Sequence, residues 1–418
     1  MNFNPAAPTT LLLDLNSCFA TIEQQANPRL RGRPVVVAAY TTPGGCILAS
    51  SREAKALGIT TGMRVQDGME RSHDLVVLPS DPQKYRAVNH ALTGLLHTYT
   101  DNLRVESIDE MVMSLEHAPA LAGVSQDHVL PTMLTLAQEI KKRIKHELGE
   151  WLTVSIGIAP NQYLAKTASN LEKPDGLVAI TSKNILSILG RMRLEDLSGI
   201  KEGNAGRLRA HGIGTPLAMF HAQPASLAHA FASRIGFDWW AHLHGWHVPW
   251  RSDEIKTIGH SHALGRTYAP KDARLHQILS QLIVKTGRRL RAHHFRAGGV
   301  HVSCLFADHT SWGHGEKQEV PLFANEDLYE RARTILLTSP ARPVRILAVT
   351  CFALTKDLYL QQSLFPSEEK KERLTRALDG IDARWGEFTV VPARMLGMEQ
   401  KVLDRIAFGG MRGRVATP

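Results

Sequence analysis

Two adjacent acidic residues, Asp109 and Glu110, interrupt a stretch that otherwise alternates apolar and polar residues like a β-strand. Neighbouring side chains on a strand point to opposite faces, so two adjacent carboxylates can both reach water cheaply only if they lie at a turn. Otherwise we expect them to share a bound cation. Two carboxylates held close together repel each other, and a divalent metal ion commonly offsets that repulsion. Two interpretations therefore stay open, a solvated hairpin end and half of a metal site.

A third acid, Asp14, stands near the end of the apolar run 11–15, which predicts a buried strand followed by a helix over 17–25. An acidic side chain is costly in a core unless it binds something. A strand end that leads into a helix is a common position for a metal ligand, although a helix N-cap is the plainer alternative.

Further segments would position a substrate beside these acids. A strand at 34–39 and its hairpin partner at 46–49 precede a helix over 50–58, capped by Ser50 or Ser51. Arg52 and Lys55 lie near the start of that helix, where backbone amides favour phosphate. The chain has no Gly-x-x-x-x-Gly-Lys-Ser/Thr motif, so this is not a P-loop.

The remaining pattern predicts a β- and α-rich module up to residue 180, then helices. A strand over 103–115 carries the acid pair, a helix over 132–148 and a strand over 152–158 follow, and Lys166 lies on a helix begun by Asn161. Residues 197–213 indicate a helix-hairpin-helix, whose turn would offer backbone amides and basic side chains to phosphate. We expect DNA contacts at four of its residues: Gly199, Lys201, Gly203 and Arg207.

The composition is that of an ordinary globular chain of two to four domains: 418 residues, 43% hydrophobic and 21% charged. No apolar run is long enough to span a membrane, and no signal peptide is visible, so we expect a cytoplasmic protein without a membrane partner. The four cysteines are scattered, which indicates reduced thiols and no zinc site.

The net charge of +9 is concentrated at 256–300, a segment that contains nine Lys and Arg residues and a single acidic residue, Asp272. A positive stripe on a neutral body is typical of phosphate-backbone binding, and a solvated helix face is the alternative. Its strongest candidates are Arg288, Arg289 and Arg291. Around them, residues 259–405 predict a binding domain with helices at 272–296, 325–337 and 367–386 and strands at 300–306, 344–354 and 388–391.

Taken together, the motifs resemble the Y-family translesion DNA polymerases, of the DNA polymerase IV and polymerase V catalytic-subunit type, over about residues 10–400. The matching strings begin at Asp14 (DLNSCFA), Ser107 (SIDE), Ser155 (SIGIAPN) and Lys173 (KPDG). The resemblance implies an α+β multidomain right-hand polymerase with palm, small fingers, helical thumb and C-terminal little finger. The implied bounds are palm 1–27 and 82–180, fingers 28–81, thumb 181–248, little finger 256–405 and a flexible tail at 406–418.

The resemblance also implies roles for single residues. Asp14 and Asp109 would bridge two Mg²⁺ ions, the Leu15 carbonyl would join the nucleotide-side ion, and Glu110 would hold the ion at the primer 3′-hydroxyl. Phe19 occupies the position at which, in this family, an aromatic ring excludes the 2′-hydroxyl of a ribonucleotide. The expected nucleotide-binding residues are Phe19, Ala49, Ser50, Arg52, Lys55, Tyr85 and Lys166.

Three further features of the sequence bear on nucleotide binding and on partners. Arg52 replaces a frequent Tyr, and an Arg there can still meet phosphate. Ile47, Ala49 and Ser50 are slim, which predicts a roomy site tolerant of damaged bases. Gln361, Leu364 and Phe365 resemble the peptide that docks bacterial polymerases on the sliding clamp, with packing of Leu364 and Phe365 on their own domain as the alternative.

The implied activity is template-directed, low-fidelity translesion synthesis in DNA damage bypass, from a dNTP onto a primer–template, by a monomer without a proofreading exonuclease. A catalytically silent DNA-binding relative is the rival interpretation, and the retention of all three carboxylates argues against it. A nucleotide cyclase on a similar palm is a third, and it would need neither a helix-hairpin-helix nor a basic domain.

Overall fold

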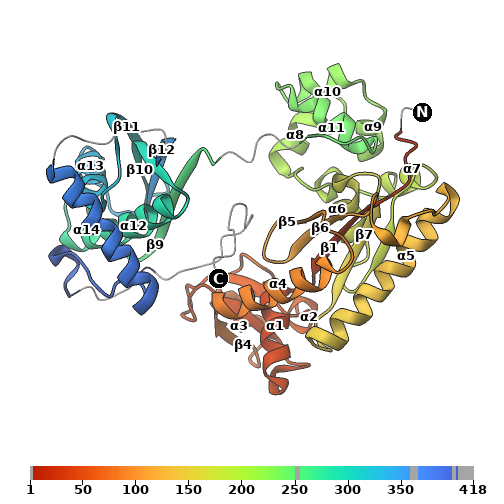
Figure 1. Ribbon diagram of the computed structural model, residues 1–418, viewed down its shortest axis with the longest axis horizontal. Helices are drawn as coiled ribbons and strands as arrows, with labels where there is room; N and C mark the ends of the chain where they lie inside the picture. The colour runs from red at the N-terminus through yellow and green to blue at the C-terminus, as the bar shows by residue number, and fades with distance from the viewer. Residues whose placement is uncertain (1–2, 250–254, 358–365, 398–401, 403–418) are drawn as a thin grey trace. The chain divides into compact units, whose positions relative to one another are not determined.

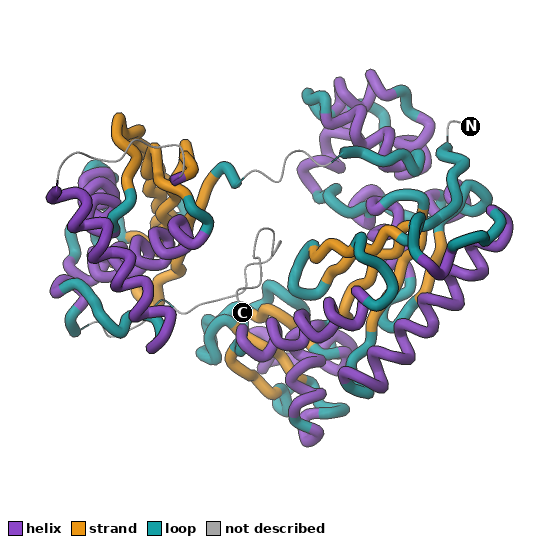
Figure 2. Tube along the Cα trace, in the orientation of Figure 1, coloured by secondary structure: helices purple, strands orange, loops and turns teal. Residues whose placement is uncertain are grey.

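The computed structural model describes residues 3–249, 255–357, 366–397 and 402. The described residues form two compact units, one up to residue 249 and one from residue 255. The first unit holds two sheets and the second holds one (Figures 1 and 2), and each unit has its own hydrophobic core clusters. No helix among the described residues is long and apolar enough to cross a membrane.

The first unit is organised around a five-stranded sheet in the order β5-β6-β1-β7-β8. Its strands are β1 (Thr10–Leu15), β5 (Leu103–Val105), β6 (Glu110–Ser114), β7 (Val154–Ala159) and β8 (Leu177–Ala179). The central strand β1 runs antiparallel to both β6 and β7. Its alternating leucines fill both sides of the sheet, because Leu11 and Leu13 join one core cluster and Leu12 joins the other.

Helices cover both faces of this sheet (Figure 1). They are α1 (Cys18–Ala26), α4 (Pro82–His97), α5 (Gln126–Arg143), extended by a π-helical turn (Ile144–Leu148), and α6 (Gln162–Leu171). Helix α6 lies directly on β7 at Gly157, where a Cβ atom would come within 1.9 Å of the Ala165 carbonyl oxygen. A glycine at this position therefore lets α6 approach the sheet closely enough to bring its side chains to the end of β1.

A smaller three-stranded sheet, in the order β3-β2-β4, lies beside α1. Its elements are β2 (Val35–Ala38), β3 (Ile47–Ser50), β4 (Val76–Pro79), α2 (Arg52–Ala56) and α3 (Val65–Arg71). The hairpin expected between 34–39 and 46–49 is confirmed, and Ser51 caps α2 by accepting from the Ala54 amide at 3.2 Å.

A cluster of short helices completes the first unit: α7 (Ile185–Leu189), α8 (Glu202–Ala210), α9 (Pro216–His221), α10 (Pro224–Ala230) and α11 (Ile235–Leu243). Their apolar faces share one core with α6. Asn161, the N-cap of α6, ties them to the sheet because its side chain donates to the carbonyl oxygens of His242 and Trp246, at 3.0 and 2.9 Å.

The second unit is a four-stranded sheet, in the order β11-β10-β12-β9, with helices packed on it. Its elements are β9 (Thr257–Tyr268), α12 (Ala273–Ala292), β10 (Phe295–Phe306), β11 (Ser311–Leu322), α13 (Asn325–Leu337), β12 (Val344–Lys356) and α14 (Pro366–Trp385).

Several sequence expectations need correction. The stretch 103–115 is a hairpin of β5 and β6 and not one strand. Helix α5 begins at Gln126, six residues before the expected start. In the second unit the sequence reading missed β9 and β11, and 388–391 forms no strand.

Candidate active site

Asp109 and Glu110 lie at a tight hairpin end that is also the edge of a polar cluster. The Glu106 amide donates to the Glu110 carbonyl oxygen at 2.9 Å, which closes the turn between β5 and β6. The Ser107 hydroxyl donates to Asp109 Oδ1 at 2.5 Å and accepts from the Glu110 amide at 3.0 Å. From α4, Asn89 donates to the Ile108 carbonyl oxygen at 3.0 Å and so fixes the turn from outside.

Strand pairing brings the third carboxylate to this turn. Asp14 is the direct partner of Glu110 in the β1–β6 ladder, and the Leu15 amide donates to the Asp109 carbonyl oxygen at 2.8 Å. The acid pair therefore lies at a hairpin end and beside a buried third acid, and its interpretation as half of a metal site stays a prediction.

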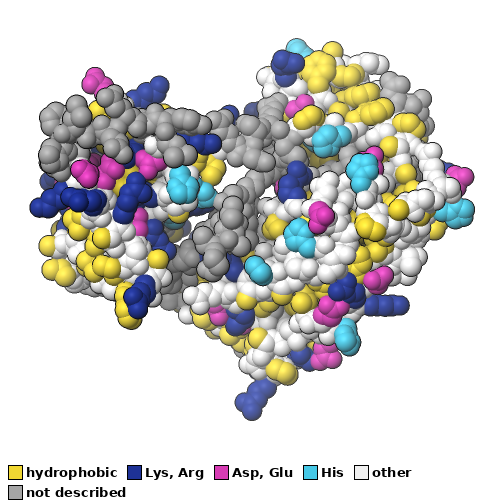
Figure 3. All heavy atoms as spheres, viewed as in Figure 1, with side chains coloured by type: hydrophobic (Ala, Val, Ile, Leu, Met, Phe, Trp, Pro, Cys, Tyr) yellow, Lys and Arg dark blue, Asp and Glu magenta, His cyan; other side chains and the backbone are white. Residues whose placement is uncertain are grey.

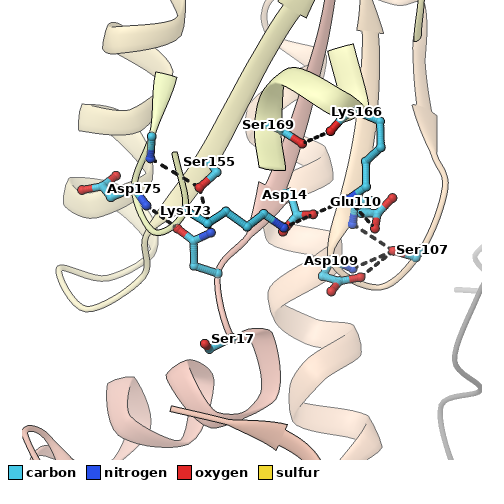
Figure 4. A network of polar contacts seen from close by, with 12 residues as sticks. Asp14, Ser17, Ser107, Asp109, Glu110, Ser155, Lys166, Ser169, Lys173 and Asp175 are labelled. Atoms are coloured by element: carbon cyan, nitrogen blue, oxygen red, sulfur yellow. Dashed lines mark hydrogen bonds and ion pairs between the residues drawn. The ribbon is translucent and has the colours of Figure 1, made fainter. Parts of the chain in front are cut away.

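Two lysines neutralise most of this negative charge (Figure 4). Lys166 Nζ, from α6, lies 2.5 Å from Asp14 Oδ2 and 2.9 Å from Glu110 Oε1. Lys173 Nζ lies 2.7 Å from the same Asp14 oxygen. The cluster therefore holds three carboxylates against two ammonium groups and keeps a net negative charge, which suits a further cation.

The pKa directions follow from this crowding. Burial, followed by the charges of Asp14 and Glu110, raises the pKa of Asp109. Burial alone would lower the pKa of Lys166, but Asp14 and Glu110 raise it above its ordinary value. Burial lowers the pKa of Lys55, and the nearby charge of Lys173 adds to that effect.

The turn that carries Lys173 is held on two sides. Asn16, two residues after Asp14, accepts from the Asp175 amide at 2.8 Å and donates to Ser155 Oγ at 2.9 Å. On the other side, the Asp175 carboxylate pairs with Lys141 of α5 at 3.0 Å and with Lys145 of the following π-helical turn at 2.8 Å. Lys173 is thus presented to Asp14 by a turn that is anchored to the sheet and to a helix.

Phe19 and Tyr85 form a stacked pair below the cluster, with ring centroids 4.3 Å apart. Phe19 is almost fully buried, and its expected role beside the sugar stays a prediction. Tyr85 is fully buried, and its hydroxyl donates to Glu23 Oε1 at 2.9 Å. This hydroxyl is engaged inside the α1–α4 contact, so the structure gives Tyr85 a supporting place under Phe19 and no free group for phosphate.

The expected nucleotide residues of β3 and α2 lie in different surroundings. Lys55 is exposed and reaches the site, where its Nζ donates to Ser17 Oγ at 2.8 Å. Ser50 is buried, and its hydroxyl has no hydrogen-bond partner among the residues that the structure describes, while Ala49 is half-buried. Ile47, expected beside them, is fully buried in the core of the small sheet and cannot face a base pair. Arg52 turns to Trp151, with its Cζ 5.8 Å from the ring centroid.

A metal would find suitable ligand chemistry here, because carboxylate and carbonyl oxygens are the donors that Mg²⁺ prefers. Within the described residues, no three Asp, Glu, His or Cys side chains converge closely enough to hold an ion. Lys166 and Lys173 account for this, since their ammonium groups stand at Asp14 and Glu110. The donor chemistry suits Mg²⁺, and the two ammonium groups offset only part of the negative charge of the three carboxylates.

The stretch expected to be a helix-hairpin-helix forms a short 3-10 helix (Leu194–Asp196), a turn at Gly199 and helix α8. Gly199 has φ +84°, a conformation that favours glycine, and a Cβ there would contact the Trp239 ring at 3.1 Å. Lys201, Gly203 and Arg207 are exposed, as phosphate contacts require.

Part of the basic stripe at 256–300 pairs with acidic residues inside the second unit. Arg291 is buried, and its guanidinium binds both carboxylate oxygens of Asp379 in α14, at 2.5 and 2.8 Å. Arg288 Nη1 lies 3.6 Å from Glu387 Oε1. The structure therefore contradicts a DNA-binding role for Arg291, because its side chain holds α14. On the face drawn in Figure 3, basic side chains of this unit lie beside acidic ones.

The expected clamp-binding residues, Gln361, Leu364 and Phe365, lie outside the described residues. Sequence reasoning missed three contributors that the structure brings to the site: Asn89, Ser107 and Lys173. Ser107 and Lys173 stood inside recognised motifs, which was a usable signal, whereas nothing in the sequence marked Asn89.

Comparison with known proteins gives consistent matches along most of the chain. The model of the impB/mucB/samB family matches residues 13–170, and that of the impB/mucB/samB family C-terminal domain matches residues 255–364. DNA polymerase IV 2 of Bacillus subtilis (strain 168) is 30% identical over 409 residues, covering 95% of this chain and 96% of that protein. DNA polymerase IV of Moorella thermoacetica is 30% identical over 392 residues, covering 90% and 93%.

Solved structures match as well. A Y-family DNA polymerase chimera of Dbh and Dpo4 has a TM-score of 0.71 at 22% identity, covering 83% of this chain and 99% of that chain. An insertion ternary complex of Dbh DNA polymerase has a TM-score of 0.56 at 22% identity, covering 82% and 98%.

Proposed function

The chain belongs to the impB/mucB/samB family of Y-family DNA polymerases, and we propose that the carboxylates of Asp14, Asp109 and Glu110 are its catalytic centre. The predicted fold class, a right-hand polymerase with a separate C-terminal domain, is confirmed. The chain is a DNA-directed DNA polymerase that carries out translesion synthesis.

One observation carries the assignment of the centre. The β1–β6 pairing sets Asp14 opposite Glu110, with Asp109 in the adjoining turn and Lys166 and Lys173 alongside. Acidic and basic side chains in one place suit a reaction in which a cation and a polyphosphate must bind together.

Asp14, Asp109, Glu110 and the Leu15 carbonyl would hold two Mg²⁺ ions. When bound, such ions neutralise the charge that develops on the attacking and leaving oxygens. The primer 3′-hydroxyl loses its proton to solvent and its oxygen bonds to the α-phosphorus of the dNTP. The bond from that phosphorus to the oxygen bridging the α- and β-phosphates breaks, and pyrophosphate leaves. The rate of this transfer depends mainly on the alignment of the reacting atoms and on neutralisation of the phosphate charge. The main task of the protein is therefore to position the primer end and the dNTP.

The surrounding side chains have separate roles in this proposal. Lys55, Lys166 and Lys173 bind the triphosphate, and the two lysines on Asp14 exchange a carboxylate partner for phosphate oxygens. Phe19, supported from below by Tyr85, lies against the sugar and excludes a 2′-hydroxyl.

The partners follow from the same chemistry. The substrates are a dNTP and a primer–template DNA, which the exposed Lys201 and Arg207 of the helix-hairpin-helix would grip by its phosphates. We retain as proposals a sliding-clamp partner at Gln361, Leu364 and Phe365, a monomeric state and a cytoplasmic location.

Primer extension tests the function directly. Wild-type protein with Mg²⁺ and one dNTP at a time should add the nucleotide that pairs with each template base, and should also extend across a template with an abasic site. Addition that ignores the template base would contradict the proposal, as would no addition from any dNTP.

A further inference from the structure

Trp151 lies at the junction between the five-stranded sheet and the small three-stranded sheet. It is half-buried in the loop between the end of α5 and β7. Two arginines from the small-sheet side contact its ring: the Cζ atom of Arg31 lies 5.4 Å from the ring centroid and that of Arg52 lies 5.8 Å away. A guanidinium within about 6 Å of an aromatic ring is attracted by the ring's negative face.

Gln24 ties the same junction together from below. This side chain of α1 is 2% exposed. Its Oε1 accepts from Trp151 Nε1 at 3.1 Å, and its Nε2 donates at 3.1 Å both to Glu53 Oε2 in α2 and to the Leu30 carbonyl oxygen. The amide thus joins the tryptophan, the linker into the small sheet and the first turn of α2.

Helix α2 carries these contacts into the active site. Arg52 and Glu53 form its first turn, and Lys55 lies in its last turn with Nζ 2.8 Å from Ser17 Oγ. The helix spans only Arg52–Ala56, so a shift of its first turn also shifts Lys55.

We propose that Trp151, Arg31, Arg52 and Gln24 form a clasp that sets the position of α2, and through it the position of Lys55, for dNTP binding. Trp151 and Arg52 are positioning residues in this account, since they act through Lys55. The inference rests on the proposed function, in which Lys55 binds the triphosphate. It replaces the expectation that Arg52 contacts the nucleotide itself.

Steady-state single-nucleotide incorporation tests the clasp with Trp151→Ala, Arg52→Ala and the double variant. Trp151→Ala should raise the KM for dNTP about three- to tenfold, the loss expected for two cation–π contacts and one hydrogen bond. The kcat should stay within about twofold, because the carboxylates are untouched. The double variant should have nearly the KM of Trp151→Ala, since residues that act as one unit are not additive.

Two results would overturn the clasp. One is a wild-type KM in Trp151→Ala. The other is a double variant whose KM increase is the product of the single increases, which would assign Arg52 its own contact with the nucleotide. Failure of the wild-type protein to incorporate any dNTP would instead contradict the proposed function and is therefore distinguishable.

Matched variants separate positioning from general damage. Trp385→Ala removes a tryptophan that is 68% exposed in the second unit and should leave the KM unchanged. Trp151→Phe keeps a ring for the arginines and loses only the donor to Gln24, so its KM should lie between those of wild type and Trp151→Ala. If Trp151→Ala fails to fold, Trp151→Phe and Arg52→Ala carry the test, and a wild-type KM in both would overturn the proposal.

Discussion

Asp14 is the residue on which the electrostatics of the site converge. It is 5% exposed, and one of its oxygens accepts from both Lys166 and Lys173. A buried carboxylate with two ammonium partners is stable in the folded chain, yet each partner can turn to a phosphate when a substrate arrives. Asp109 lacks such a partner in the described site and is stabilised by the Ser107 hydroxyl.

Phe19 gives the first prediction at this scale. Phe19→Ala removes the ring that stacks on Tyr85, so the preference for a dNTP over the matching rNTP should fall about tenfold or more in kcat/KM. The free energy of unfolding should fall by about 3 kcal/mol because a buried ring is lost. Phe220→Ala, a buried ring of α9, controls for that loss and should keep sugar selectivity. Unchanged selectivity in Phe19→Ala would remove Phe19 from the gate role.

Lys173 gives a second prediction. Lys173→Ala should raise the KM for dNTP about tenfold, because a charge-assisted contact with the triphosphate is lost. Lys183→Ala removes an exposed lysine shortly after β8 and is the matched control. A normal KM in Lys173→Ala would limit Lys173 to balancing the charge of Asp14.

At the scale of elements, close packing and long-range pairing decide where these side chains meet. Gly157 lets α6 lie on β7, and Asn16 fastens the 173–176 turn to the sheet. Long-range pairing also explains why Arg291 was assigned to the DNA-binding stripe from the sequence. A run of arginines reveals a local positive charge but not the residues with which the arginines pair. Arg291 pairs with Asp379, which lies in a helix that begins more than 70 residues later.

Arg291→Ala should destabilise the second unit by about 3 kcal/mol, since it leaves Asp379 without its partner at the edge of the core. Urea unfolding of the full chain should show an earlier transition for this unit. Arg288→Ala should shift that transition far less, because its ion pair is longer and more exposed. Unchanged stability together with weaker DNA binding would restore Arg291 as a DNA contact.

The helix-hairpin-helix gives the element-scale prediction for DNA. Lys201→Ala and Arg207→Ala should each reduce the slope of log affinity against log salt by about 0.9, the effect of one lost phosphate contact. Fluorescence anisotropy with a labelled primer–template measures this slope. Arg209→Ala is the control, because that guanidinium already pairs with Glu195. A wild-type slope in Lys201→Ala and Arg207→Ala, as in the control, would exclude this turn from the DNA interface.

At the scale of the whole molecule, the sequence predicted the parts that local chemistry specifies. Asp14 and the acid pair broke apolar patterns, and the capped helices over 52–56 and 162–171 were visible from their caps. Strands β9 and β11 were missed because most of their exposed positions carry glycine, polar or charged residues, which leave no regular apolar alternation along the sequence. The partners of Lys173 and Arg291 depend on tertiary packing, which spacing along the chain does not reveal.

The central claim is that the three carboxylates perform the transfer, and single-turnover incorporation by Asp109→Asn tests it most directly. Burial raises the pKa of Asp109, so the ionised carboxylate lowers the stability of the folded protein at neutral pH. The free energy of unfolding of Asp109→Asn should therefore equal or exceed that of the wild type. We expect its rate with Mg²⁺ to fall about 1000-fold or more, while Asp101→Asn, an exposed acid before β5, keeps the wild-type rate. A folded Asp109→Asn protein with near wild-type incorporation would contradict the account.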